Sequence, residues 1–196
     1  MLLAGFVYHP YVANATDTEA TAAEAAADTT RWGLAHVMIG VGYSLAVLAF
    51  IAIRSYLHAA GEERWSTVGL PFAAFGSALF VMLPGMELAP LTAAETGGNP
   101  AAAQDELVPW LVPILVVAAI TFAVGAFGFA IGITRSAVLS PRLNWIVAGG
   151  LVVMAVARFM PLGAAQIVIG VAAVVALWPL AYKMWQTTEG STRAPV

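Results

Sequence analysis

The sequence contains no cysteine, which excludes disulfides, thiolate nucleophiles, iron–sulfur clusters and thiol-ligated zinc. It is also poor in charge: only 10% of its 196 residues are Asp, Glu, Lys or Arg, and Lys183 is the single lysine. With a net charge of −3 and no run of basic residues, the chain shows no sign of binding nucleic acid. The hydrolase motifs GxSxG and HExxH are missing as well, so the sequence does not support hydrolytic chemistry.

Hydrophobic residues are what the chain has in excess. They make up 61% of the sequence, and the mean hydropathy is +0.86. A soluble domain carries about 45–50% apolar and about 25% charged residues. One soluble core could not hide this much apolar surface, so lipid is the expected solvent. The sequence therefore predicts an all-α polytopic transmembrane helix bundle, built as a single integral membrane domain over residues 1–196.

Five stretches are long and apolar enough to cross a hydrocarbon core of about 30 Å. They lie at about 32–57, 67–90, 107–134, 143–161 and 164–185. The first apolar run, MLLAGFVY at residues 1–8, is too short to cross, because eight helical residues cover roughly 12 Å. Two interpretations remain open for this run: it is the last half of a sixth span, or it is a short segment at the membrane interface.

The distribution of basic residues predicts the orientation of the bundle. Six of the eight Lys and Arg residues fall on one side, which is therefore expected to be cytoplasmic: Arg54, Arg64, Arg135, Arg142, Lys183 and Arg193. This places the C-terminus, with a tail at 186–196, in the cytoplasm, and the loops at 13–31 and 92–106 outside. The richness in Ala, Gly and Val favours the cell membrane of a bacterium or an archaeon. The acidic segment 13–31 lacks large apolar residues and is expected to be a flexible or weakly helical loop.

Four polar residues fall at one depth, near the expected external ends of the spans. His36 lies close to the start of the first span, and Gln166 opens the last one. Glu87 and Arg158 lie about 24–27 Å along their helices, at 1.5 Å per residue. Each of the four lies on a face of small residues, which in membranes marks contact between helices. All four are therefore predicted to point into the bundle.

A charge inside a membrane usually has a partner, because an unpaired one is costly. We therefore expect Arg158 to pair with Glu87, and His36 and Gln166 to complete a polar cluster that is structural or binds a ligand. Two other interpretations of Arg158 remain open: it reaches the headgroups from a helix end, or its pair is purely structural. Pro84 precedes Glu87 closely and is expected to kink its helix and open a small cavity.

A metal or haem site would need ligands from the same level of the bundle. The candidate metal ligands are His9, His36 and Glu87, which could all reach the external end. The sequence identifies no cofactor and no catalytic residue.

The leading interpretation is a non-enzymatic membrane protein: a structural, accessory or sensing component with a polar cluster near its external face. The alternatives are a bundle that binds haem, a metal, a lipid or a quinone, and a small transporter. The expected partners are the lipid bilayer and either a second copy of the chain or a larger membrane complex. The suggested contact between copies is a stripe of small residues: Ala118, Thr121, Gly125, Gly128 and Gly132.

Overall fold

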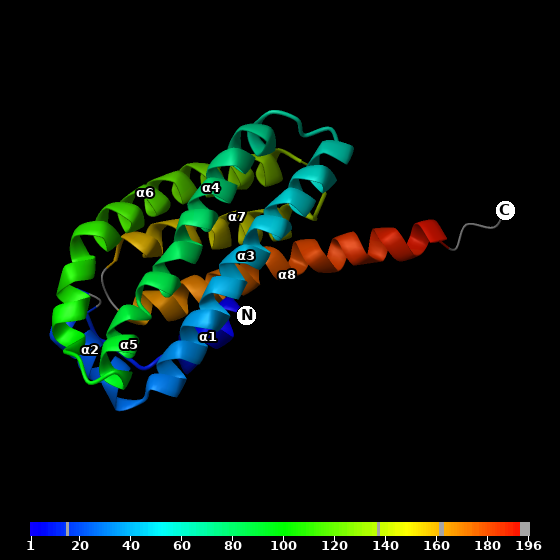
Figure 1. Cartoon of the computed structure of the whole chain (residues 1–196). Helices are drawn as coiled ribbons and strands as arrows, with labels where there is room; N and C mark the ends of the chain where they lie inside the picture. The colour runs from blue at the N-terminus through cyan, green and yellow to red at the C-terminus, as the bar shows by residue number, and fades with distance from the viewer. Residues whose placement is uncertain (15, 137, 161–162, 193–196) are drawn as a thin grey trace.

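A computed structural model describes residues 1–14, 16–136, 138–160 and 163–192 (Figure 1). In chain order the elements are α1 (Leu2–Tyr8), α2 (Thr18–Ala27), α3 (Thr29–Ala59), α4 (Trp65–Met86), α5 (Ala89–Glu95), α6 (Pro100–Arg135), α7 (Pro141–Val156), η1 (Ala157–Phe159) and α8 (Gly163–Thr192). Five helical segments are long and apolar enough to cross a membrane: Thr29–Ala59, Trp65–Glu95, Pro100–Arg135, Pro141–Phe159 and Gly163–Thr187. The predicted class, an all-α multi-pass membrane bundle, is confirmed.

The second span is interrupted just after Pro84. Helix α4 ends at Met86, and Glu87 forms its C-terminal cap, with its N–H donating to the carbonyl of Leu83 at 3.0 Å. A separate short helix, α5, then begins at Ala89. Pro84 lies inside α4 and the break comes after it, where Pro90 of α5 has no N–H to donate to the Met86 carbonyl and so weakens the continuation of α4 into α5. The break positions Glu87 in a turn rather than on a helix face.

Helices α4 and α6 form the closest contact of the bundle, backbone against backbone. A Cβ added to Gly76 of α4 would lie 2.5 Å from the Phe122 nitrogen, and one added to Gly128 of α6 would lie 2.9 Å from the Gly69 Cα. Small residues let the two backbones approach this closely. In lipid no hydrophobic effect acts between helices, and close packing of this kind drives their association instead. The small stripe of α6 therefore faces α4 inside the chain. Our expectation that it contacts a second copy is wrong.

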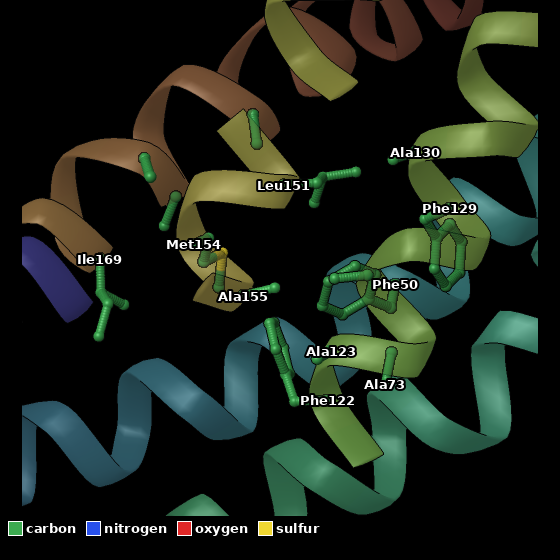
Figure 2. Close-up of a cluster of buried hydrophobic side chains, with 14 of the residues drawn as sticks. Phe50, Ala73, Phe122, Ala123, Phe129, Ala130, Leu151, Met154, Ala155 and Ile169 are labelled. Carbon is green, nitrogen blue, oxygen red and sulfur yellow. The ribbon is translucent and has the colours of Figure 1, made fainter. Parts of the chain in front are cut away.

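The centre of the bundle is filled by apolar side chains from α3, α4, α6, α7 and α8 (Figure 2). Phe50 of α3 packs on two rings of α6, with centroids 5.8 Å away at Phe122 and 4.9 Å away at Phe129. Leu151 and Met154 of α7 complete this cluster, and all five side chains are buried. Edge-on and tilted ring pairs of this kind add to the packing of the core.

The seven-residue helix α1 packs into the groove between α3 and α8. Gly42 of α3 and Gly170 of α8 make room for it: an added Cβ would lie 2.8 Å from the Leu2 nitrogen or the Leu3 Cα, respectively. Phe6, one turn after Leu2, is buried and packs edge-on against Tyr43 of α3, with ring centroids 6.5 Å apart. This places the end of α1, and His9 directly after it, beside the first turns of α3.

The expected external loop at 13–31 was predicted to be flexible or weakly helical, and its described part is largely helical. Asp17 caps α2 by accepting from the Ala20 N–H at 2.9 Å, and Asp28 caps α3 by accepting from the Arg31 N–H at 2.9 Å. Capping residues and a run of alanines favour a helix here. Helix α2 lies against α5 and α6 and covers one end of the bundle, called here the capped end (Figure 1). At the other extreme, α8 continues to Thr192, so the described part of the predicted tail is helical too.

Candidate ligand-binding site

A cavity of about 350 Å³ lies beneath the capped end. Its walls come from the end of α1, from α3, α4 and α6, and from η1 and the first turns of α8. All four residues of the predicted polar cluster line this cavity, together with the candidate ligand His9: His36, Glu87, Arg158 and Gln166. The structure therefore brings the predicted residues to one place, although their contacts differ from those expected.

His36 and Glu87 form the first polar contact of the cavity. The His36 Nε2 lies 2.7 Å from Glu87 Oε2, and its Nδ1 lies 2.7 Å from the carbonyl oxygen of Trp32. A carbonyl oxygen only accepts hydrogen bonds, so the network assigns a hydrogen to Nδ1. Nε2 and Oε2 then need one proton between them: either doubly protonated His36 faces a carboxylate, or neutral His36 accepts from protonated Glu87. In both cases the pair carries no net charge.

Trp32 holds this pair in place. Its side chain is 1% exposed, and its indole Nε1 donates to the backbone oxygen of Glu87 at 2.8 Å. Its ring lies 4.6 Å from the His36 ring and 4.7 Å from the His9 ring, centroid to centroid. A tryptophan at the end of a membrane span often belongs to an interfacial belt, but Trp32 is a buried residue that joins α1, α3 and the turn after α4. Trp110, 71% exposed on α6, does have the exposure that a belt residue needs.

Arg158 forms the second polar group of the cavity. Its side chain is 7% exposed, so it does not reach the lipid headgroups. Its Nη1 donates to the Tyr43 hydroxyl at 2.7 Å, and its guanidinium carbon lies 4.2 Å above the Phe80 ring and 4.1 Å above the Phe122 ring. Aromatic faces stabilise a cation in such positions. The predicted ion pair with Glu87 is wrong, because the described structure pairs Glu87 with His36 and Arg158 with Tyr43.

Two donors of Arg158 remain without an acceptor. Within the described part of the chain, neither Nε nor Nη2 has a hydrogen-bond partner, and both atoms are enclosed. The Oε1 of Gln104, which also lines the cavity, is likewise buried without a partner. Buried polar groups are usually paired, and an unpaired one costs about 1–3 kcal/mol, more when the group is charged. A bound molecule that supplied hydrogen-bond partners to these atoms would gain the most binding free energy there.

The turn after α7 explains how an arginine reaches this position. Helix α7 ends at Val156, and the chain continues as the short 3₁₀ turn η1, whose middle residue is Arg158. The turn carries Arg158 inward, while its neighbour Phe159 is 54% exposed. The interpretation that Arg158 reaches outward from a helix end is therefore wrong.

The candidate metal ligands His9, His36 and Glu87 lie close together, but His36 is bonded to Glu87 rather than free to bind a metal ion. The His9 and His36 rings are 4.8 Å apart, and both nitrogens of His36 already have partners. His9 Nδ1 lies 2.6 Å from the Pro10 oxygen. Burial, assisted by the nearby His36, lowers the pKa of His9 to about 4, so that its ring is neutral at pH 7. Among the described residues, no group of three His, Cys, Asp or Glu side chains could hold a metal ion.

The wall of the cavity formed by α6 is apolar in the part of the helix that lies within the membrane. It consists of Val108, Leu111, Val112, Leu115 and Val116. Most of the polar groups come from other elements, from α3, the turn after α4, η1 and α8, while α6 contributes Gln104. The cavity thus combines a few polar groups with a largely apolar lining, an arrangement that suits a molecule with a polar group and a hydrocarbon part.

Sequence reasoning missed three residues of this site. Tyr43 lies two helical turns after His36 on the same face of α3, so the 3.6-residue period could have identified it as a partner for a buried cation. Phe80 is an ordinary core residue by pattern, and only the fold shows that its ring covers Arg158. Gln104 was assigned to a loop, and the structure places it in the first turns of α6.

Comparison of the chain with protein-family models, with curated proteins and with solved structures found no match. The argument for function therefore rests on the geometry of the cavity.

Proposed function

We propose that this multi-pass membrane protein binds a small amphipathic molecule in the cavity beneath the capped end. The observation that carries the proposal is Arg158, a buried cation at the cavity wall with two donor atoms for which no described residue supplies an acceptor. A charge in a membrane is costly unless it is paired, and such residues usually mark a functional site. A ligand oxygen on the guanidinium would remove this cost.

The size and chemistry of the cavity support the same function. Its volume of about 350 Å³ falls within the range of small-molecule sites, about 300–1,000 Å³. Such sites combine mainly apolar walls with a few polar groups that orient the ligand. Here the apolar wall of α6 faces Arg158, Gln166 and the His36–Glu87 pair. A purely structural arginine would satisfy its donors within the protein, so the structure favours the binding role over a structural one.

We further propose that the capped end faces the outside of the cell membrane of a bacterium or an archaeon. The basic residues support this orientation, because most of the described ones lie in or beside the helix segments at the other end of the bundle. The acidic residues that lie near the capped end agree with it: Asp17, Glu19, Glu24, Asp28, Glu95, Asp105 and Glu106. The cavity would then open beneath the outer surface of the membrane.

The binding proposal is tested with the full chain in phosphatidylcholine nanodiscs. The protein is equilibrated with a panel of single-chain amphiphiles (palmitate, hexadecanol, decyl-quinone and lysophosphatidate) and examined by native mass spectrometry. We expect saturable 1:1 binding of at least one member. The variant Leu115→Trp, which places an indole in the cavity, should abolish it. The matched control is Val124→Trp on the same helix, since Val124 is 45% exposed to lipid and lies outside the cavity.

Two results would overturn the proposal. The first is that no amphiphile binds the unaltered protein above the level of nanodiscs without protein. The second is that Leu115→Trp binds as well as Val124→Trp does, because adducts would then lie on the lipid-facing surface and not in the cavity.

A further inference from the structure

The charge of the cavity restricts what it can hold. Besides the Tyr43 phenol, four ionisable residues line it in the described structure: His9, His36, Glu87 and Arg158. The His36–Glu87 pair shares one proton and is neutral as a unit, because Nδ1 of His36 donates to a carbonyl and Nε2 faces the carboxyl group. The His9 ring, enclosed by Trp32 and His36, is neutral. The cavity therefore carries a net charge of about +1, that of Arg158, and favours an anion over a neutral molecule.

The free donors of Arg158 restrict the shape of that anion. Nη1 is engaged with Tyr43, and the two donors left are Nε and Nη2. These two atoms form one edge of the planar guanidinium, with parallel N–H bonds that match the two oxygens of a carboxylate or phosphate. Phe80 covers one face of the guanidinium and also lines the cavity.

The outer residues of the cavity indicate where the ligand comes from. Besides the polar Thr16, which is exposed just before α2, four side chains that line it are also exposed on the surface: Val112 at 45%, Val116 at 48%, Phe159 at 54% and Met160 at 52%. They belong to α6 and to the end of η1, so the cavity reaches the surface of the bundle between these two elements. All four are apolar, and α6 is a membrane-spanning helix. A mouth of this composition gives access from the hydrocarbon of the bilayer rather than from water.

We propose that the ligand is a single-chain lipid carboxylate, a long-chain fatty acid, which enters from the bilayer between α6 and η1. Its carboxylate binds the Nε–Nη2 edge of Arg158, and its chain lies along the apolar wall of α6. This inference rests on the proposed function and specifies its ligand. A single chain fits better than a two-chain lipid, because about 350 Å³ lies at the lower end of the range for ligand sites.

The test compares palmitate with hexadecanol, which has the same chain and a neutral headgroup. Equilibrium binding of each radiolabelled compound to the full chain in phosphatidylcholine nanodiscs is measured at pH 8, with protein-free nanodiscs subtracted. We expect palmitate to bind at least tenfold more tightly than hexadecanol. Arg158→Gln should remove this preference, so that palmitate binds no more tightly than hexadecanol, and Arg158→Lys, which keeps the charge without the planar edge, should retain part of it. The matched control Arg31→Gln should bind palmitate like the unaltered protein, since Arg31 lies outside this cavity.

The comparison in the unaltered protein needs no variant, so it decides the question even if Arg158→Gln does not fold. Equal binding of palmitate and hexadecanol, with both lost in Leu115→Trp, would overturn the fatty-acid inference and leave the binding function standing. Tighter binding of lysophosphatidate than of palmitate would overturn it in favour of a phosphate headgroup. Failure of every amphiphile to bind would instead overturn the proposed function itself.

Discussion

At the scale of single residues, the unusual feature is a guanidinium enclosed by three aromatic side chains. Tyr43, Phe80 and Phe122 all lie within 5.1 Å of the guanidinium carbon of Arg158, measured to the ring centroids. Tyr43 alone also offers an oxygen, and it lies at the deepest polar position of α3 that contacts the cavity. The tyrosine hydroxyl therefore provides the one hydrogen bond that the described structure shows for this cation.

Tyr43→Phe should destabilise the protein while leaving the shape of the site intact. The change removes the acceptor for Nη1 and leaves a third donor of a buried cation unpaired, a loss of about 1–3 kcal/mol. Thermal unfolding in detergent, followed by circular dichroism, measures this loss. Tyr182→Phe provides the control, because Tyr182 is 60% exposed, and its loss of a hydroxyl should change little. Equal effects of the two changes would show that the Tyr43 bond does not stabilise the fold.

The partner of Arg158 was predicted wrongly for a physical reason. A rise of 1.5 Å per residue places Arg158, Glu87 and His36 at one depth, and that part of the prediction agrees with their common cavity. Equal depth in the bundle does not determine which way each side chain points. Glu87 lies in the turn after α4, where its side chain no longer follows the face of α4, and it meets His36 of α3 instead.

At the scale of helices, the contact between α4 and α6 should tolerate no added atom. A Cβ on Gly125 would collide with the backbone of Ala73, lying 2.6 Å from its Cα. Gly125→Ala should therefore push the helices apart and cost about 1–3 kcal/mol. Gly149→Ala in α7 is the matched control, since an added Cβ meets nothing within 4 Å there and the change should stabilise by about 0.5–1 kcal/mol. Unfolding measurements that rank the two variants the other way would contradict this packing.

The start of α4 makes stability depend on pH through Glu62. Its carboxylate accepts from the N–H groups of Trp65 at 2.7 Å and Ser66 at 3.0 Å. Burial raises the pKa of Glu62, but hydrogen bonding from Ser66 and Trp65 outweighs it, so the pKa lies below its ordinary value of 4.5. Because the pKa is lowered in the folded state, this carboxylate stabilises the fold above pH 4.5, and the contribution is lost as the pH falls through the lowered value.

Glu62→Ala should accordingly cost about 0.5–2 kcal/mol at pH 7, the usual range for a helix cap. The cost should shrink as unfolding is measured at progressively lower pH, below 4.5. Glu63→Ala is the control, because the Glu63 side chain is 72% exposed and its carboxylate lies 3.6 Å from the exposed ring of His58. A cost of Glu62→Ala that stays constant from pH 7 to pH 3 would contradict the capping role.

At the scale of the whole molecule, hydropathy predicted the spans because each must cross about 30 Å of hydrocarbon. Hydropathy did not predict the helix that covers the capped end. Helix α2 is held by one capping aspartate and by small buried residues such as Ala22 and Ala25, which carry little hydropathic signal. The cavity could not be predicted from hydropathy either, since it depends on how α6 lies relative to η1. Tertiary geometry of this kind leaves no periodic mark in the sequence.

The absence of cysteine makes the orientation of the bundle directly testable. Glu24 of α2 is exposed at the capped end, and Glu63 is exposed in the turn at the opposite end. In intact cells, a membrane-impermeant maleimide should label Glu24→Cys, and it should label Glu63→Cys only after the cells are broken open. The unaltered chain, which contains no thiol, sets the background. The reverse pattern would place the cavity on the cytoplasmic side, and the charge distribution would then have failed to orient the protein.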